Sequence, residues 1–354
     1  MTLCSAFDYS LCDMAKWAFT TRRVKRADVA NISGNFAIAQ AGDLILCEVV
    51  EIGQHKKIQL AERRTSAMYP GDLVVLCVGD RYAPDQFLSR ASVGDDIVAL
   101  AAGGGVCGEI EAAHLRMDEP TRLRPIGLLL NRAGSVINVA DYALPTMPAD
   151  NRVTVFGVFG ASMNSGKTTA AASLAHGLRR AGYSTVGVKA TGTGAFGDFN
   201  AFDDAGVAVM DFTDVGMATT YRVPMERIAR GFDTLIGTAA QSGAEVVVVE
   251  FADGVFQQET RAILQGSRIR DRLDGLLFAA PDALGAMGGV AVLERYGLSP
   301  FAISGMLTLS PLATQEALEI TGLPILSRDE LWDPAVISRH ASPLMRANNN
   351  QVAA

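Results

Sequence analysis

Apolar residues in the second half of the chain form short uninterrupted runs that alternate with stretches of helical periodicity. The apolar runs lie at 153–160, 184–190, 245–252, 275–280, 301–307 and 323–327. The helical stretches lie around 167–182, 224–241, 282–297 and 312–321. Runs that are apolar on both faces and separated by helices are typical of a parallel sheet with helices on both sides. We therefore predict an α/β domain over 153–340.

The first 145 residues follow a different pattern, in which short β-rich runs are broken by glycine and proline. "GDLILCEVVEI" and "GDLVVLCVGD" are two such runs, and each begins at a turn signal. They predict a smaller β-rich domain, either a barrel or a sandwich, with one helix near "LCDMAKWAF". The proline-bearing residues 146–152 are the predicted linker, and 341–354 are predicted to form a disordered tail.

Composition narrows the class of protein. The chain has 354 residues, of which 49% are hydrophobic, so two domains can each bury a core. Its formal net charge of -7 argues against a surface built for nucleic acid. No signal peptide is expected, because Asp8, Asp13 and Lys16 interrupt the N-terminal apolar residues. The longest uncharged run, between Arg295 and Glu316, contains prolines and is a poor membrane span. We expect a cytoplasmic protein with neither a nucleic-acid nor a membrane partner.

Cysteine and histidine do not form a recognisable metal site. The cysteines are Cys4, Cys12, Cys47, Cys77 and Cys107, all in the first third of the chain. Their number is odd and no two are spaced as Cys-x-x-Cys, so we predict reduced thiols that serve packing. The four histidines show no ligand spacing either.

One stretch, "VFGVFGASMNSGKTTAAASLAHGL", carries recognisable chemistry. The usual phosphate-binding (Walker A) loop has a glycine, four residues and then Gly-Lys-Ser/Thr. Here that first position falls on Ala161, and the glycine stands one place earlier, at Gly160. The stretch nevertheless follows an apolar run and opens a helical one, where backbone N–H groups and the helix dipole favour phosphate. Lys167 would bridge the β- and γ-phosphates, and Thr168 would bind Mg²⁺. The expected nucleotide-binding residues of the loop are Gly160, Asn164, Ser165, Gly166, Lys167, Thr168 and Thr169.

Charged residues end two of the predicted strands. Glu250 ends the run at 245–252, at the sheet edge where metal and terminal phosphate bind in open α/β sheets. It is expected to bind the metal or orient a nucleophile; the alternative is a surface acid. Lys189 ends the run at 184–190 and would place a second cation beside the transferring phosphoryl group. The alternative is that Lys189 only caps a strand at the surface. Together with Lys167, these are the predicted catalytic residues.

The lengthened loop resembles that of dethiobiotin synthetase and its relatives, which also have five residues between the glycine and Gly-Lys-Thr. "VGVKATGTG" is similar to that family's Lys-Pro-x-x-Ser/Thr-Gly motif, with Lys189, Thr193 and Gly194 in place and Ala190 instead of proline. "VVVVEFADG" resembles the strand that ends in Glu-Gly-Ala-Gly-Gly, with Glu250 at the acidic position. MobB-type proteins and an ATPase family linked to D-glutamate N-acetylation have similar loops. The resemblance covers about residues 152–330.

The resemblance implies further site residues. Thr193 would contact an acceptor, and Ser304 stands where the base-binding segment is expected to have asparagine. An aspartate after the second strand would bind Mg²⁺; Asp204 is nearest to the matching distance and Asp198 is its main competitor. A homodimer is implied as well. The other carboxylates of this acidic region are Asp203, Asp211 and Asp214.

Two arginines are candidates for lining an acceptor pocket. They are Arg222 in "TTYRVP" and Arg261 in "QQETR". A single arginine also commonly makes a surface ion pair, so a structural position is the alternative for both.

Together these features predict an ATP- and Mg²⁺-dependent enzyme that transfers the γ-phosphoryl group to a small acceptor. The acceptor would be a carboxylate or carbamate activated for ligation, or a hydroxyl as in a small-molecule kinase. ATP is favoured because no Asn/Thr-Lys-x-Asp motif for guanine is present. The alternatives are a nucleotide-dependent switch or metallochaperone, a polynucleotide kinase, and an N-acyltransferase on the same fold.

Overall fold

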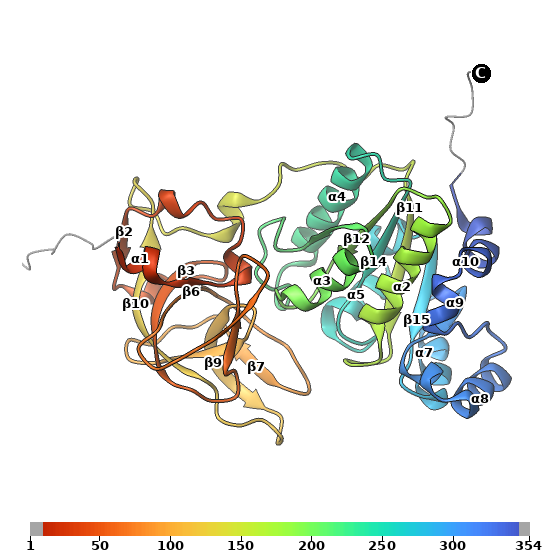
Figure 1. Ribbon diagram of the computed structural model, residues 1–354, viewed down its shortest axis with the longest axis horizontal. Coiled ribbons are helices and arrows are strands. Elements are labelled where there is room, and N and C mark those ends of the chain that lie inside the picture. The colour runs from red at the N-terminus through yellow and green to blue at the C-terminus, as the bar shows by residue number, and fades with distance from the viewer. Residues whose placement is uncertain (1–9, 347–354) are drawn as a thin grey trace, which may run out of the picture. The chain divides into compact units, whose positions relative to one another are not determined.

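The structure, a computed structural model, describes residues 10–346 and divides the chain into two compact units (Figure 1). The first unit contains the chain up to Leu144 and two later segments, Thr193–Phe196 and Phe212–Arg222. The second unit contains Pro145–Gly192, Gly197–Asp211 and the chain from Val223 onward. A β-rich N-terminal part and an α/β part were both predicted. The sequence pattern, however, assigned the two later segments to the α/β part.

The first unit is built on a closed β-barrel. Strands β3, β10, β8, β9 and β6 pair in that order, and β6 pairs with β3 again, so the ring closes. The strands and helix of this unit are α1 (Ser10–Met14), β1 (Lys16–Trp17), β2 (Asn31–Ser33), β3 (Leu44–Glu51), β4 (Lys57–Gln59), β5 (Thr65–Ala67), β6 (Leu73–Val78), β7 (Phe87–Arg90), β8 (Val98–Ala102), β9 (Val106–Ala113) and β10 (Arg122–Leu130). The sequence predicted either a barrel or a sandwich, and the structure has a barrel.

The continuous apolar run in β3 follows from burial on both faces. Ile45, Cys47 and Val49 belong to one buried cluster, together with side chains of β6, β8 and β10. Leu44 and Leu46 belong to a second cluster that includes Trp17. Because successive strand residues point to opposite faces, two covered faces require apolar residues at every position.

The second unit contains a six-stranded sheet in which every strand pair is parallel. The strand order is β13-β12-β14-β11-β15-β16. The strands are β11 (Thr154–Gly160), β12 (Thr185–Lys189), β13 (Ala208–Asp211), β14 (Val246–Glu250), β15 (Gly275–Ala279) and β16 (Ala302–Ser304). Five of the six predicted runs form these strands. The run at 323–327 forms only a single bridge, between Ile303 and Ile325, and β13 was not predicted.

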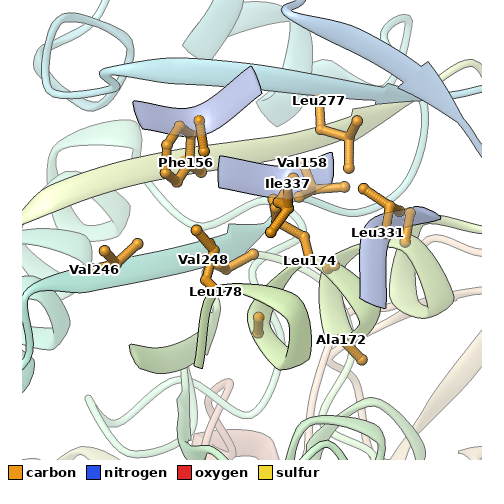
Figure 2. Close-up of a cluster of buried hydrophobic side chains, with 14 of the residues drawn as sticks. Phe156, Val158, Ala172, Leu174, Leu178, Val246, Val248, Leu277, Leu331 and Ile337 are labelled. Atoms are coloured by element: carbon orange, nitrogen blue, oxygen red, sulfur yellow. The ribbon is translucent and has the colours of Figure 1, made fainter. Parts of the chain in front are cut away.

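Helices cover both faces of this sheet (Figure 1). On one face, Phe156 and Val158 of β11 pack with Leu174 and Leu178 of α2 (Figure 2). On the other face, Phe159 stacks on Phe251 at a centroid distance of 4.4 Å, and Phe232 of α4 lies beside Phe251. The helices are α2 (Lys167–Arg180), α3 (Phe196–Asp204), α4 (Met225–Gln241), α5 (Gln258–Gln265), α6 (Arg268–Asp271), α7 (Ala283–Arg295), α8 (Pro311–Thr321), α9 (Arg328–Trp332) and α10 (Pro334–Ala341). The predicted α/β architecture is confirmed.

The C-terminal end of the described chain packs on the second unit. Ile337 and Ala341 of α10 are buried in the cluster that α2 covers. Beyond them, Arg346 Nε donates to Asp274 Oδ1 at 2.7 Å. Residues 341–346 therefore make specific contacts, although the sequence placed them in a disordered tail; 347–354 lie outside the described residues. Within 10–346, no helix combines the length and the apolar character needed to cross a membrane.

Candidate functional site

The loop between β11 and α2 adopts the shape of a phosphate cradle. Asn164 and Gly166 have left-handed φ angles of 63° and 93°, which glycine adopts freely and asparagine tolerates. The loop is fixed at both ends by segments of the second unit: strand β15 and the turn that follows β16. Ala161 N donates to Ala279 O at 2.9 Å, and Met306 N donates to Ser165 O at 3.0 Å. The first helical residues of α2 therefore follow a backbone turn that directs N–H groups toward one point.

Gly160 explains the unusual spacing of the motif. A Cβ atom at this position would lie 2.4 Å from Ser165 Oγ and 2.7 Å from Lys167 Cγ. The Lys167 side chain therefore passes directly over the Gly160 backbone. A glycine is required where this crossing occurs, and in the lengthened loop it occurs at 160.

Lys167 is the first residue of α2 and its side chain folds back over the loop. Its Nζ donates to the Ser162 carbonyl at 2.8 Å, and the residue is buried. Burial lowers the pKa of Lys167, against the attraction of the Glu250 and Asp253 carboxylates. The ammonium is thus held at the loop by a single backbone acceptor, which a phosphate oxygen can replace.

Three oxygen ligands converge at the start of α2. Thr168 Oγ1 lies 2.8 Å from Asp198 Oδ1 and 2.9 Å from Glu250 Oε1. A hydroxyl has one hydrogen, so it donates to one carboxylate at a time. Glu250 is 2% exposed, and its Oε2 is buried without a hydrogen-bond partner. Each buried polar atom without a partner has a free-energy cost that an incoming cation can remove.

Lys189 brings a second positive charge to the same place. It pairs with Asp198, and its Nζ lies 3.8 Å from Glu250 Oε1. Burial alone would lower the pKa of Lys189, but the Asp198 and Glu250 carboxylates outweigh it and raise that pKa. Burial raises the pKa of Glu250, which Lys189 only partly offsets. For Asp198, burial alone would raise the pKa, but attraction to Lys189 together with hydrogen bonds from Lys189 and Thr168 outweighs burial and lowers the pKa.

A glycine-rich loop after the first strand of a parallel sheet thus opens a helix with Lys167 and Thr168. The adjacent strand ends in the acidic Glu250, which contacts that threonine. The second unit has a P-loop NTPase fold. This assignment rests on the strand–loop–helix unit and the parallel sheet of the chain itself.

Comparisons with known proteins give only distant structural matches. No protein-family model matches the chain, and no curated protein matches it. Among solved structures, it is similar to the signal recognition particle 54 kDa protein from Aeropyrum pernix in complex with GDP, at a TM-score of 0.35 and 18% identity. It is also similar to the signal recognition particle receptor FtsY from Elizabethkingia anophelis, at a TM-score of 0.36 and 16% identity.

These matches are partial as well as distant. The match to the 54 kDa protein covers 55% of this chain and 49% of that protein. The match to FtsY covers 50% of this chain and 57% of that protein. The chain therefore spans about half the length of these relatives. At such identities and TM-scores, the likeness carries no functional assignment.

A cavity of about 420 Å³ adjoins the P-loop. Ser304, predicted from the sequence for the base-binding segment, lies in its wall and is buried. The same wall contains Gly166, Thr169, Arg328 and Asp329. The sequence analysis missed Arg328 and Asp329, because the five-residue helix α9 is too short to leave a periodic pattern.

The structure separates the two aspartates considered for Mg²⁺. Asp198 lies in the first turn of α3 and reaches Thr168, whereas Asp204 lies six residues later, about 9 Å further along the helix axis. Asp204 is exposed and lines a different cavity of about 410 Å³, with His176 and Trp332. Of the two candidates, Asp198 is the one that contacts Thr168, and metal binding by either aspartate stays a prediction.

The residues expected around an acceptor lie on different parts of the chain. Thr193 belongs to the first unit, where it bridges to Thr219. Arg222 belongs to that unit too, and its guanidinium lies 3.1 Å from Asp80 and 3.0 Å from Glu111. Arg261 lies on an exposed face of α5. Contacts of these residues with an acceptor stay predictions.

The oxygen-bearing side chains of the site suit a hard cation such as Mg²⁺. A threonine hydroxyl and two carboxylates are hard ligands, which Mg²⁺ prefers. Among the residues that the structure describes, no group of three or more His, Cys, Asp or Glu side chains could hold a metal ion. Such a small protein ligand set is typical of Mg²⁺ that is shared with substrate phosphates and water.

Proposed function

We propose that the second unit binds a nucleoside triphosphate together with Mg²⁺ and cleaves its terminal phosphoanhydride bond. The proposal rests on the cluster of Lys167, Thr168, Lys189, Asp198 and Glu250, which comes from the first turns of α2 and α3 and the ends of two adjacent strands. The lysines provide positive charge for phosphate oxygens, and the three oxygen-bearing side chains provide ligands for a hard cation. Phosphoryl transfer requires both, and the side chains that would supply them lie within one cluster.

The chain's own residues would perform most of the work by positioning. Loop N–H groups and the start of α2 would hold the phosphates, and Lys167 would exchange the Ser162 carbonyl for a phosphate oxygen. Lys189 would stabilise negative charge that develops on the transferring group. Thr168, Asp198 and Glu250 would hold Mg²⁺. When bound, this ion neutralises charge on the β- and γ-phosphate oxygens.

ATP is the proposed nucleotide. The cavity beside Gly166 can accept a base, and its wall presents the small polar Ser304. The sequence contains no Asn/Thr-Lys-x-Asp motif for guanine. Parallel assays with GTP test this choice directly.

Hydrolysis coupled to a conformational change is the first candidate for the fate of the γ-phosphoryl group. Thr193 and Arg222, which were expected near an acceptor, belong to the first unit, and Arg222 is ion-paired there. In this candidate water would be the acceptor, as in a nucleotide-dependent switch. Transfer to a small acceptor is the second candidate. It is supported by the resemblance of Lys189, Thr193 and Gly194 to the dethiobiotin synthetase motif.

The experiment that separates these candidates measures ADP and phosphate release from ATP with Mg²⁺. It includes a panel of amino acids, diamines, carboxylates and hydroxyl compounds, with and without bicarbonate. Slow release that no compound stimulates supports the switch, whereas a jump with one compound supports small-molecule transfer. No release with ATP or GTP under any condition would overturn the proposed function. Sedimentation of the same sample tests the predicted homodimer.

A further inference from the structure

The two residues that form the central ion pair of the site flank a segment of the other unit. Lys189 ends β12, and Asp198 lies in the first turn of α3. Between them, Thr193–Phe196 belong to the β-barrel unit. The chain thus leaves the nucleotide site after Lys189, contributes four residues to the barrel unit, and returns with Asp198.

Backbone and side-chain contacts within the barrel unit hold this tetrapeptide. Gly194 N donates to Ala218 O at 3.0 Å, next to the bridge between Thr193 and Thr219. Phe196 N donates to the side chain of Gln59 at 2.7 Å. The Phe196 ring meets the edge of the Phe19 ring at a centroid distance of 6.1 Å. Both ends of the tetrapeptide are therefore fixed in the barrel unit.

The partner segment of these contacts is itself anchored in the barrel unit. Arg22 Nη2 lies 2.7 Å from Asp214 Oδ2, and Arg23 Nη1 lies 3.5 Å from Asp214 Oδ1. At the other end, Arg222 pairs with Asp80 and Glu111. Ion pairs near both ends therefore hold Phe212–Arg222, the segment that contacts Gly194.

Gly104 of the barrel makes the closest approach. A Cβ atom at 104 would lie 1.8 Å from the Gly194 carbonyl oxygen and 3.0 Å from Ala195 Cα. These are backbone atoms, which cannot swing aside as a side chain can. The neighbouring Gly103 is a matched contrast, since a Cβ atom there would lie 3.5 Å from the Lys57 carbonyl oxygen, an ordinary contact.

We propose that the β-barrel positions the nucleotide site by holding residues 193–196, so that Lys189 and Asp198 pair in front of Thr168. Gly104 and Gln59 are positioning residues in this scheme, because they act through the tetrapeptide. The inference rests on the proposed nucleotide function. It adds that the barrel unit controls the activity of the nucleotide site. A change in the barrel that loosens the tetrapeptide lowers turnover without touching the P-loop.

The test compares Gly104→Ala with Gly103→Ala in the full chain. Displacing a positioned group by about 1 Å can cost about 100-fold in rate, so Gly104→Ala should lower kcat by that order and raise the Mg²⁺ concentration needed for half-maximal rate. Gly103→Ala should keep both values. ADP affinity should be similar in the two variants, because the loop and its adjoining cavity are unchanged. A folded Gly104→Ala protein with normal kcat and Mg²⁺ dependence would overturn the inference.

Gln59 provides a second test that does not depend on a clash. Gln59→Ala removes the acceptor for Phe196 N–H, whereas Gln59→Glu keeps an acceptor oxygen. Hydrogen exchange of the ligand-free protein should be faster in the first turn of α3 for Gln59→Ala and restored in Gln59→Glu. This readout needs no activity, so it separates failure of the inference from failure of the proposed function. Unchanged exchange in α3 for both Gln59→Ala and Gly104→Ala would contradict the inference.

Discussion

Lys189 and Glu250 stand opposite each other, in register, at the carboxyl ends of neighbouring parallel strands, with Lys189 Nζ 3.8 Å from Glu250 Oε1. Both residues are buried, and each charge reduces the cost of burying the other. Because β14 also borders β11, the same carboxylate reaches the first turn of α2. Strand β14, paired with β12 on one side and β11 on the other, thus brings the second lysine, the acidic residue and the P-loop threonine together.

Glu250→Gln should reduce turnover by about 100-fold, the effect expected when one charged group is removed from a preorganised site. The amide has nearly the same volume but can no longer balance Lys189 or bind Mg²⁺ as a carboxylate. Rates measured across a Mg²⁺ titration should show a higher requirement for the ion. A normal rate with unchanged Mg²⁺ dependence would make Glu250 a structural residue.

The two aspartates of α3 that are candidates for Mg²⁺, Asp198 and Asp204, should differ sharply. Asp198→Asn should lower the apparent Mg²⁺ affinity by about 10- to 100-fold, since it weakens a metal ligand and its pairing with Lys189. Asp204→Asn is the matched control on the same helix and should leave Mg²⁺ affinity unchanged. Mg²⁺ titrations of ATP turnover compare the two variants. The reverse ranking would restore Asp204 as the ligand.

Gly160→Ala should damage nucleotide binding while the remaining loop sequence stays intact. Its Cβ atom would overlap the Lys167 side chain and Ser165 Oγ, and overpacking of this kind typically costs about 1–3 kcal/mol. Calorimetric titration with ADP measures the loss. Gly288→Ala in α7 is the control, because nothing lies within 4 Å of its added Cβ. Equal affinities in the two variants would remove the structural reason for the lengthened loop.

The cysteines of the barrel unit should be unreactive in the folded protein. Burial raises the pKa of Cys12 to about 11 and that of Cys77 to about 12, and it also raises the pKa values of Cys47 and Cys107. At pH 8 these groups remain protonated thiols, which are poor nucleophiles. In a Cys4→Ser variant, iodoacetamide should label no thiol until guanidinium chloride is added. Rapid labelling of the native variant would contradict a packing role.

The sequence predicted the second unit closely because its signals are local. The helices predicted at 167–182 and 224–241 are observed as α2 and α4, with ends shifted by at most two residues. These segments combine helical periodicity with a clear start after Gly166 or Pro224. The four-residue strand β13 has no such signal, and the run at 323–327 lacks a strand partner beyond one bridge.

The remaining features depend on contacts between distant parts of the chain. Nothing in the sequence around Thr193 or Arg222 indicates that they join the barrel unit, since their partners are Thr219, Asp80 and Glu111. The choice between Asp198 and Asp204 likewise depends on which turn of α3 faces Thr168. Spacing along the chain could name both candidates but could not orient the helix.

The most direct test of the account is phosphate release from ATP by the wild-type protein and by Lys167→Ala, each with Mg²⁺ and with EDTA. The wild type should release phosphate only with Mg²⁺. Lys167→Ala should lose at least about 100-fold of that rate with an unchanged circular dichroism spectrum. A Lys25→Ala variant, which changes an exposed lysine of the barrel unit, should match the wild type. Equal activity of the wild type and a folded Lys167→Ala protein would contradict the proposed nucleotide site.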